Sequence, residues 1–142
     1  MPARISSAAT RIRVRYAETD QMGVVYHANY LIWMEVARTD LCKSIGFNYK
    51  DMEGTDGILL AVTEAHCRYL RAARYDDEIE ISATLTEANQ RFVTFDYEMN
   101  CEGRRVATGQ TRHVFLSRDM RPTRLPAKYF AMFGIDKAGI AT

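Results

Sequence analysis

The chain has 142 residues, of which 47% are hydrophobic, so we expect one domain over residues 1–142 with a substantial core. Its formal net charge is only +1 and its 19 basic residues are spread along the chain, which argues against nucleic acid as a partner. The sequence has no apolar run of the about eighteen residues that a transmembrane segment needs, and no signal peptide at its start, so we expect a soluble cytoplasmic protein.

A first strand is predicted over residues 11–16. Apolar Ile12, Val14 and Tyr16 alternate there with arginines, which is the period of a half-buried strand. The polar segment 17–23 follows and ends in a glycine, so we expect a loop.

One amphipathic helix is predicted over residues 28–45. Gly46 follows it, where a left-handed residue can end a helix. Glu35 and Arg38 lie off the apolar stripe at i, i+3 spacing and predict a surface ion pair. The stripe itself, which predicts core packing, consists of Tyr30, Trp33, Met34, Ala37, Leu41 and Ile45.

Four long strands are predicted after the helix, and the last two are joined by a tight hairpin at Glu102 and Gly103. One strand, one long helix and four further strands predict an α+β fold with a long antiparallel sheet around one central helix. We expect this core over about residues 11–117, with one or two helical turns in the tail 118–142. The four strands are 59–70, 78–87, 92–101 and 105–117.

The cysteines and histidines do not have the spacing of metal ligands. Cys42, Cys67 and Cys101 lie far apart in apolar or strand-like surroundings, and we expect reduced thiols. His66 and His113 fall within predicted strands, so no metal site is predicted.

The run Asp-Gln-Met-Gly-Val-Val-Tyr-His-Ala-Asn-Tyr at residues 20–30 resembles the signature of 4-hydroxybenzoyl-CoA thioesterase-type hotdog proteins, particularly the YbgC-like branch. Residues 68–85 are similar to two later strands of that family. The resemblance covers most of residues 11–116. It implies a hotdog fold and a homodimer or homotetramer that pairs sheets edge to edge, with active sites at the subunit interface. The implied substrate is an acyl-CoA, so no separate cofactor is expected.

The same resemblance assigns roles to residues of the motif. Asp20 matches the catalytic carboxylate, and His27 matches the residue whose backbone N–H contacts the thioester oxygen. Tyr16 and His27 also match pocket positions. The remaining candidates for substrate binding are Gly23, Val24, Val25, Tyr26, Ala28, Asn29 and Tyr30.

Elementary chemistry agrees with this assignment. Thioester hydrolysis needs an activated attack and a stabilised oxyanion. The first N–H groups of a helix have no internal partners, so those near residues 26–29 are expected to polarise a carbonyl oxygen. Asp20 precedes Ala28 by eight residues, beyond a glycine turn, and can face the same carbonyl. The sequence leaves open whether Asp20 attacks directly or deprotonates a water.

Arginines are predicted to bind the phosphates of coenzyme A, because guanidinium groups pair with phosphate through two hydrogen bonds. The candidates are Arg91, Arg118 and Arg121, and Glu35 is kept as a backup carboxylate.

Three functions are compatible with the sequence. The first is hydrolysis of a short-chain, medium-chain or aromatic acyl-CoA to free acid and coenzyme A. The second is a non-catalytic module that binds acyl-CoA or acyl-carrier protein, because a fold alone does not determine function. The third is an enoyl-CoA hydratase that uses Asp20 and His27 together.

Overall fold

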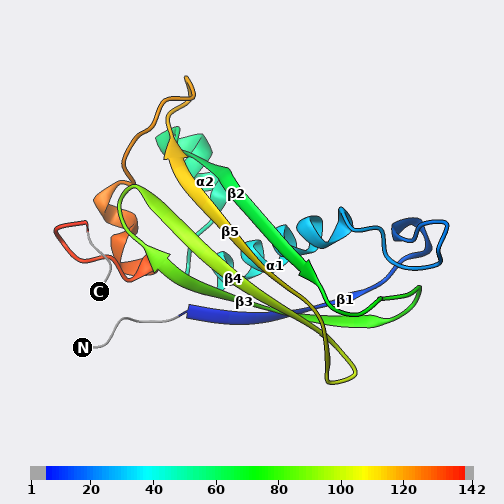
Figure 1. The fold of residues 1–142 in the computed structure, drawn as a ribbon. Helices are drawn as coiled ribbons and strands as arrows, with labels where there is room; N and C mark the ends of the chain where they lie inside the picture. The colour runs from blue at the N-terminus through cyan, green and yellow to red at the C-terminus, as the bar shows by residue number, and fades with distance from the viewer. Residues whose placement is uncertain (1–5, 140–142) are drawn as a thin grey trace.

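A five-stranded antiparallel sheet curves across one side of the helix α1 (Asn29–Ser44) in the computed structural model, which describes residues 6–139 (Figure 1). The strand order is β1-β3-β4-β5-β2. The predicted α+β architecture, a long sheet around one helix, is confirmed. The strands are β1 (Ser6–Arg13), β2 (Leu59–Tyr69), β3 (Glu78–Ala88), β4 (Phe92–Cys101) and β5 (Arg104–Leu116).

Short helical turns connect these elements. The last of these turns lies in the tail after residue 118 and confirms the prediction of one or two helical turns there. The two turns that follow Asn48 were not predicted. The short helical turns are η1 (Tyr16–Glu18), α2 (Tyr49–Asp51), η2 (Met52–Asp56) and η3 (Ala127–Phe133).

The turns at the ends of the predicted elements are as expected. Gly46 follows α1 with φ +90°, the left-handed conformation predicted for this position. Glu102 and Gly103 have φ values of +51° and +76°, which join β4 to β5 in a tight antiparallel hairpin.

The first strand differs from its prediction, which placed it at residues 11–16. β1 starts at Ser6 and pairs with β3 from Ser6 opposite Leu85 to Arg13 opposite Glu78. It ends early because the N–H of Arg15 donates to the Glu18 carboxylate and a 3-10 turn begins at Tyr16. The start was missed because Ser-Ser-Ala-Ala-Thr at residues 6–10 has no alternation of large apolar and polar side chains.

Most of the predicted helical stripe is fully buried against the sheet. Trp33, Met34, Ala37 and Leu41 are each at most 1% exposed. Gly109 of β5 makes room for this contact, because a Cβ atom added there would lie 2.1 Å from Cε of Met34. The close approach of helix and sheet therefore depends on a residue without a side chain.

The predicted ion pair between Glu35 and Arg38 is wrong. Arg38 is only 9% exposed, and its Nη1 donates to the hydroxyl of Tyr97 on β4 over 3.1 Å. Within residues 6–139, no carboxylate oxygen lies within 4.0 Å of the Arg38 side-chain nitrogens. The helical period explains the burial, since Arg38 follows Met34 by four residues and precedes Leu41 by three.

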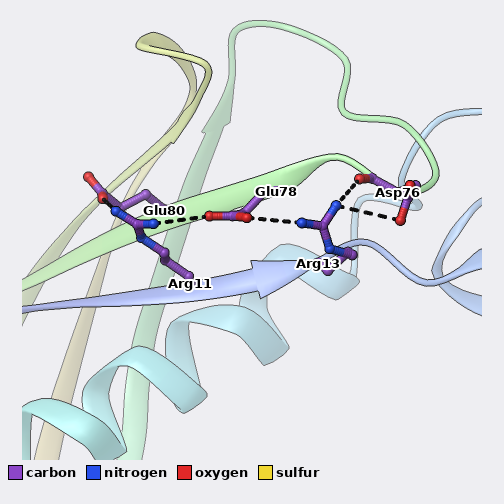
Figure 2. A network of polar contacts seen from close by, with 5 residues as sticks. All are labelled: Arg11, Arg13, Asp76, Glu78 and Glu80. Atoms are coloured by element: carbon purple, nitrogen blue, oxygen red, sulfur yellow. Dashed lines mark hydrogen bonds and ion pairs between the residues drawn. The ribbon is translucent and has the colours of Figure 1, made fainter.

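Ion pairs connect β1 to β3 on the outer side of the sheet. Arg13 lies 3.0 Å from Glu78 and 3.6 Å from Asp76, and Arg11 lies 3.3 Å from Glu78 and 3.5 Å from Glu80 (Figure 2). All five side chains are at least 44% exposed, so each pair contributes at most about 1 kcal/mol.

Apolar side chains are exposed on α1 and on the edge strand β2. The edge position leaves one row of β2 backbone groups without a neighbouring strand in the described chain. Among residues 6–139, no helix is long and apolar enough to cross a membrane. The exposed apolar residues of these two elements are Leu31, Ile32, Val36, Val62 and Tyr69, and Leu70 follows directly after β2.

Candidate active site

The loop before α1 is closed by its own backbone. Thr19 and Val25 form an isolated antiparallel bridge. The N–H of Asp20 donates to the carbonyl of Val24, and the N–H of Gly23 donates back to the carbonyl of Asp20, both over 2.9 Å. Gly23 has φ +79°, a conformation that favours glycine. The turn therefore holds Asp20 at a defined place beside the helix start.

Glu18 anchors this loop to α1. Its carboxylate accepts hydrogen bonds from Nε1 of Trp33 over 2.8 Å and from the N–H of Arg15 over 2.9 Å. Its carbonyl accepts from the N–H of Tyr26 and from Nδ2 of Asn29, both over 2.8 Å. Burial raises the pKa of Glu18, but the hydrogen bonds from Arg15 and Trp33 outweigh burial and hold the pKa below its ordinary value. Glu18 is therefore a charged structural residue under the loop.

The Asp20 carboxylate has one oxygen available. Its Oδ1 accepts from the N–H of Met22 over 2.9 Å, and within the described part of the chain Oδ2 accepts no hydrogen bond. The half-buried Asp20 side chain lines a cavity of about 300 Å³. The other lining residues are Met22, Val24, Val25, His27, Tyr30, Tyr69, Leu70, Arg71 and Ala72.

Two backbone N–H groups at the helix start are available to a ligand. Among residues 26–29, the N–H groups of His27 and Ala28 donate no hydrogen bond within the described part of the chain. The sequence predicted available donors throughout residues 26–29, but the N–H of Tyr26 donates to Glu18 and that of Asn29 donates to Tyr26. The N–H groups of Tyr26 and Asn29 are therefore unavailable to a ligand, because they already donate within the loop and the first helical turn.

Tyr69, at the end of β2, contacts the same helix start. Its hydroxyl donates to the carbonyl of His27 over 3.0 Å, and its ring lies edge-on to the ring of Tyr30 at 4.9 Å. Burial, followed by the hydrogen bond with Cys67, raises the pKa of Tyr69 to about 12, so the hydroxyl keeps its proton near neutral pH. The His27 ring lies 4.5 Å from that of Tyr26 and 6.3 Å from that of Tyr69.

Only part of the predicted site lines the cavity within one chain. Asp20, Val24, Val25, His27 and Tyr30 do so. The other predicted positions lie outside it: Gly23, Tyr26, Ala28 and Asn29 shape the turn and the helix start, and Tyr16 packs edge-on against Tyr75. Tyr16 is 78% exposed, so its predicted pocket role remains a prediction.

The predicted arginines lie away from Asp20. Arg118 donates to the carbonyls of Glu53 and Gly54, Arg121 lies 3.5 Å from Asp119, and Arg91 precedes β4. None of the three lines the cavity, whereas Arg71 does. The sequence signal for Arg71 was its place in the segment 68–85, just after the end of β2.

A larger surface hollow of about 680 Å³ lies over the ion pairs of Figure 2. Arg11 and Arg13 already pair there with acidic neighbours, so the hollow offers little unpaired positive charge. Among residues 6–139, no group of three or more His, Cys, Asp or Glu side chains is placed to hold a metal ion.

The profile of the Thioesterase-like superfamily matches residues 14–133, which include the loop, the helix and the whole cavity. The chain belongs to this superfamily. The resemblance noted in residues 20–30 is thereby confirmed, and with it the hotdog fold.

Relatives of this thioesterase-like chain include proteins that are named as acyl-CoA thioesterases. It is 38% identical to a putative acyl-CoA thioesterase, YneP of Bacillus subtilis, over 76% of this chain and 78% of that protein. It is 29% identical to the acyl-CoA thioesterase YbgC of Haemophilus influenzae, over 86% of this chain and 90% of that protein. The solved DHNA-CoA thioesterase of Staphylococcus aureus superposes with a TM-score of 0.82 at 36% identity, over 88% of this chain and 84% of that one.

Proposed function

We propose that this protein hydrolyses the thioester of a short-chain, medium-chain or aromatic acyl-CoA to the free acid and coenzyme A. One observation carries the proposal. The Asp20 carboxylate, with a free oxygen, lines the same cavity as His27, at the helix start where two N–H groups are free. The acyl-CoA thioesterase names of two relatives support the same reaction.

In the proposed reaction, the thioester carbonyl oxygen accepts hydrogen bonds from the N–H groups of His27 and Ala28. These donors stabilise the negative charge that develops on the oxygen as the carbonyl carbon becomes tetrahedral. Asp20 either takes a proton from an attacking water or attacks the carbon itself to form an anhydride, which water then hydrolyses. In both routes the C–S bond breaks and the coenzyme A thiolate leaves with the bonding electron pair.

The cavity walls suit an acyl group with an apolar or aromatic body. Val24, Val25 and Tyr30 are lining residues, and the rings of Tyr30 and Tyr69 stand edge-on to each other. The similar protein of S. aureus is a DHNA-CoA thioesterase, which favours an aromatic acid among the candidates. Arg71 is exposed at the same cavity, and we assign it to the phosphates of coenzyme A.

The proposed active unit is a homodimer or a larger homo-oligomer formed through the edge strand β2. Unpaired backbone groups and the apolar side chains Val62 and Leu70 are exposed along this edge, and Ile32 and Val36 are exposed on α1. Such a contact would bring a second copy beside Tyr69 and the cavity that contains Asp20.

The test is thiol release from a panel of acetyl-, hexanoyl-, decanoyl- and benzoyl-CoA by wild-type protein and by Asp20→Asn. The amide keeps the size of the side chain but is neither a base nor a nucleophile, so kcat/KM is expected to fall by about 10²-fold or more. Asp40→Asn, on an exposed carboxylate of α1, is the matched control and should retain wild-type activity.

Equal rates for Asp20→Asn and wild type would contradict the catalytic role of Asp20. Tight binding of an acyl-CoA without thiol release by the wild type would instead favour the non-catalytic binding module. Addition of water to an enoyl-CoA would favour the hydratase.

A further inference from the structure

A row of polar side chains crosses the core between α1 and the sheet, away from the Asp20 cavity. Arg38 Nη1 lies 3.1 Å from the Tyr97 hydroxyl, which lies 2.6 Å from Oγ1 of Thr111. The Thr111 hydroxyl lies 2.8 Å from Nε2 of His113. Tyr97, Thr111 and His113 are each at most 4% exposed, so the row lies in the protein interior.

The direction of these hydrogen bonds follows from Arg38, which can only donate. The Tyr97 oxygen accepts from Arg38, and its own proton then finds an acceptor in Thr111. The Thr111 proton in turn goes to Nε2 of His113. The reverse direction would leave the buried Tyr97 proton without an acceptor among the described residues, which is costly. If Nε2 of His113 donated to Thr111 as well, the Thr111 proton would have no acceptor among the described residues, so we place the His113 ring proton on Nδ1.

Two side-chain nitrogens at the ends of this row have no hydrogen-bond acceptor in the part of the chain that the structure describes. Among the buried side-chain nitrogens of the described residues, Nε of Arg38 and Nδ1 of His113 have no hydrogen-bond partner. Both residues line one cavity of about 300 Å³, together with Tyr49, Leu60 and three exposed charged residues, Glu35, Lys50 and Glu53. This cavity shares no lining residue with the one that contains Asp20.

The charge of Arg38 has no internal counter-ion, because no carboxylate oxygen of the described residues lies within 4.0 Å of it, as noted above. A buried cation without an anion is strongly destabilising, whereas an anion with two acceptor oxygens satisfies a guanidinium well. Burial, followed by the nearby charge of Arg38, lowers the pKa of His113 to about 3, so the ring is a neutral donor at neutral pH.

We propose that this second cavity binds a small organic carboxylate, whose oxygens accept from Nε of Arg38 and Nδ1 of His113. The Tyr49 ring and Leu60 contact its hydrocarbon part. An anion with an apolar body fits this lining better than phosphate, which would leave the Leu60 side chain and the Tyr49 ring facing an ion, although the Tyr49 hydroxyl itself lies near Arg38. The site stands independently of the thioesterase proposal, because Asp20 and the helix start take no part in it.

The experiment titrates the full-length protein with sodium benzoate at constant ionic strength, with sodium chloride and sodium phosphate as separate comparisons. Side-chain ¹H–¹⁵N spectra report the His113 ring nitrogens and the Arg38 Nε–H directly. We expect a protonated Nδ1 in free His113, and saturable shifts of both groups with benzoate that chloride and phosphate do not produce.

Arg38→Met removes the cation, and His113→Phe removes the neutral donor. Each is expected to weaken benzoate binding at this site by at least about tenfold, since hydrogen bonds to a charged group are stronger than neutral ones. Glu35→Gln is the matched control at the rim, and it should bind benzoate as tightly as wild type or more tightly, because it removes a negative charge.

Three results would overturn the proposal. The first is a His113 ring protonated on Nε2, which is measured on wild-type protein and so does not depend on any variant folding. The second is benzoate shifts confined to Tyr30, Tyr69 and His27, which would place the acid only in the cavity with Asp20. The third is unchanged benzoate affinity in folded Arg38→Met.

Discussion

Glu18 and Asp20 are two carboxylates two positions apart in the sequence, with different surroundings. Glu18 is 5% exposed, and both of its oxygens accept hydrogen bonds, from Arg15 and Trp33. Asp20 is half-buried, and one of its oxygens is free among the described residues and available at the cavity. The first is suited to hold the loop in place and the second to act on a ligand.

Glu18→Gln is expected to lower the free energy of unfolding by about 1–3 kcal/mol at pH 7, because it removes a charged acceptor that the fold satisfies. The pKa of Glu18 is lower in the folded protein than in the unfolded chain, where it is about 4.3. The stabilisation by its charge is therefore fully present above about pH 4.3 and is lost as pH falls through the folded pKa.

Urea unfolding at several pH values from 3 to 7 measures this difference. Glu102→Gln, on an exposed hairpin residue, is the matched control and should change stability by less than about 0.5 kcal/mol at every pH. A stability difference between wild type and Glu18→Gln that stays constant down to pH 3 would contradict the role of the Glu18 charge.

At the level of elements, the contact between α1 and β5 depends on Gly109. A methyl group there would overlap the Met34 side chain, which is 0% exposed, and would lie 3.0 Å from the carbonyl of His66. Gly109→Ala is therefore expected to cost about 1–3 kcal/mol of stability by overpacking. Thermal or urea unfolding measures the cost.

The Met34→Ala background provides the control for this prediction. Shortening Met34 removes the overlapping Cε atom, so the added cost of Gly109→Ala should be smaller in that background than in wild type. Equal costs in both backgrounds would show that Met34 is not the neighbour that limits residue 109.

Periodicity predicted the helix and all five strands, because large apolar side chains recur there at the period of each structure, but it placed the first strand at 11–16 and not at Ser6–Arg13. It failed where side chains are small or amphipathic. Residues 6–10 became strand because β3 pairs with them, although their own pattern is weak. Arg38 was placed on the surface by its charge, but its long apolar stem lies in the core while its head reaches Tyr97.

The candidate site was predictable only where it is local in sequence. Asp20 and the helix start lie within one motif, so a resemblance over eleven residues identifies them. Tyr69 and Arg71 come to the same cavity from the end of β2 and the chain just after it, far along the sequence. Arg91, Arg118 and Arg121 were chosen for their charge and, for Arg91, for its place before a strand; none of them lines the cavity of the single chain, and their phosphate role stays a prediction.

At the level of the whole molecule, the proposed oligomer is tested by Ile32→Glu. This apolar residue of α1 is 53% exposed in the single chain, and a charge there would be costly to bury against a second subunit. We expect wild type to sediment as a dimer or larger species, and Ile32→Glu to shift toward monomer and lose thioesterase activity together.

Met120→Glu is the matched control, since this methionine is 65% exposed in the turn after β5. It should leave both sedimentation and activity unchanged. A folded Ile32→Glu protein that sediments like wild type would exclude this face of α1 from the subunit contact.

The hydrogen bond from Tyr69 to His27 joins residues 42 positions apart. A carbonyl and the N–H that follows it belong to one planar, rigid group, so the hydroxyl that holds the His27 oxygen also sets the direction of the Ala28 N–H. The end of β2 thus sets the orientation of the Ala28 N–H at the start of α1. A small rotation of the last residues of β2 would therefore rotate the Ala28 N–H as well. Tyr69→Phe removes the hydroxyl, and the peptide plane between His27 and Ala28 would then be free to rotate.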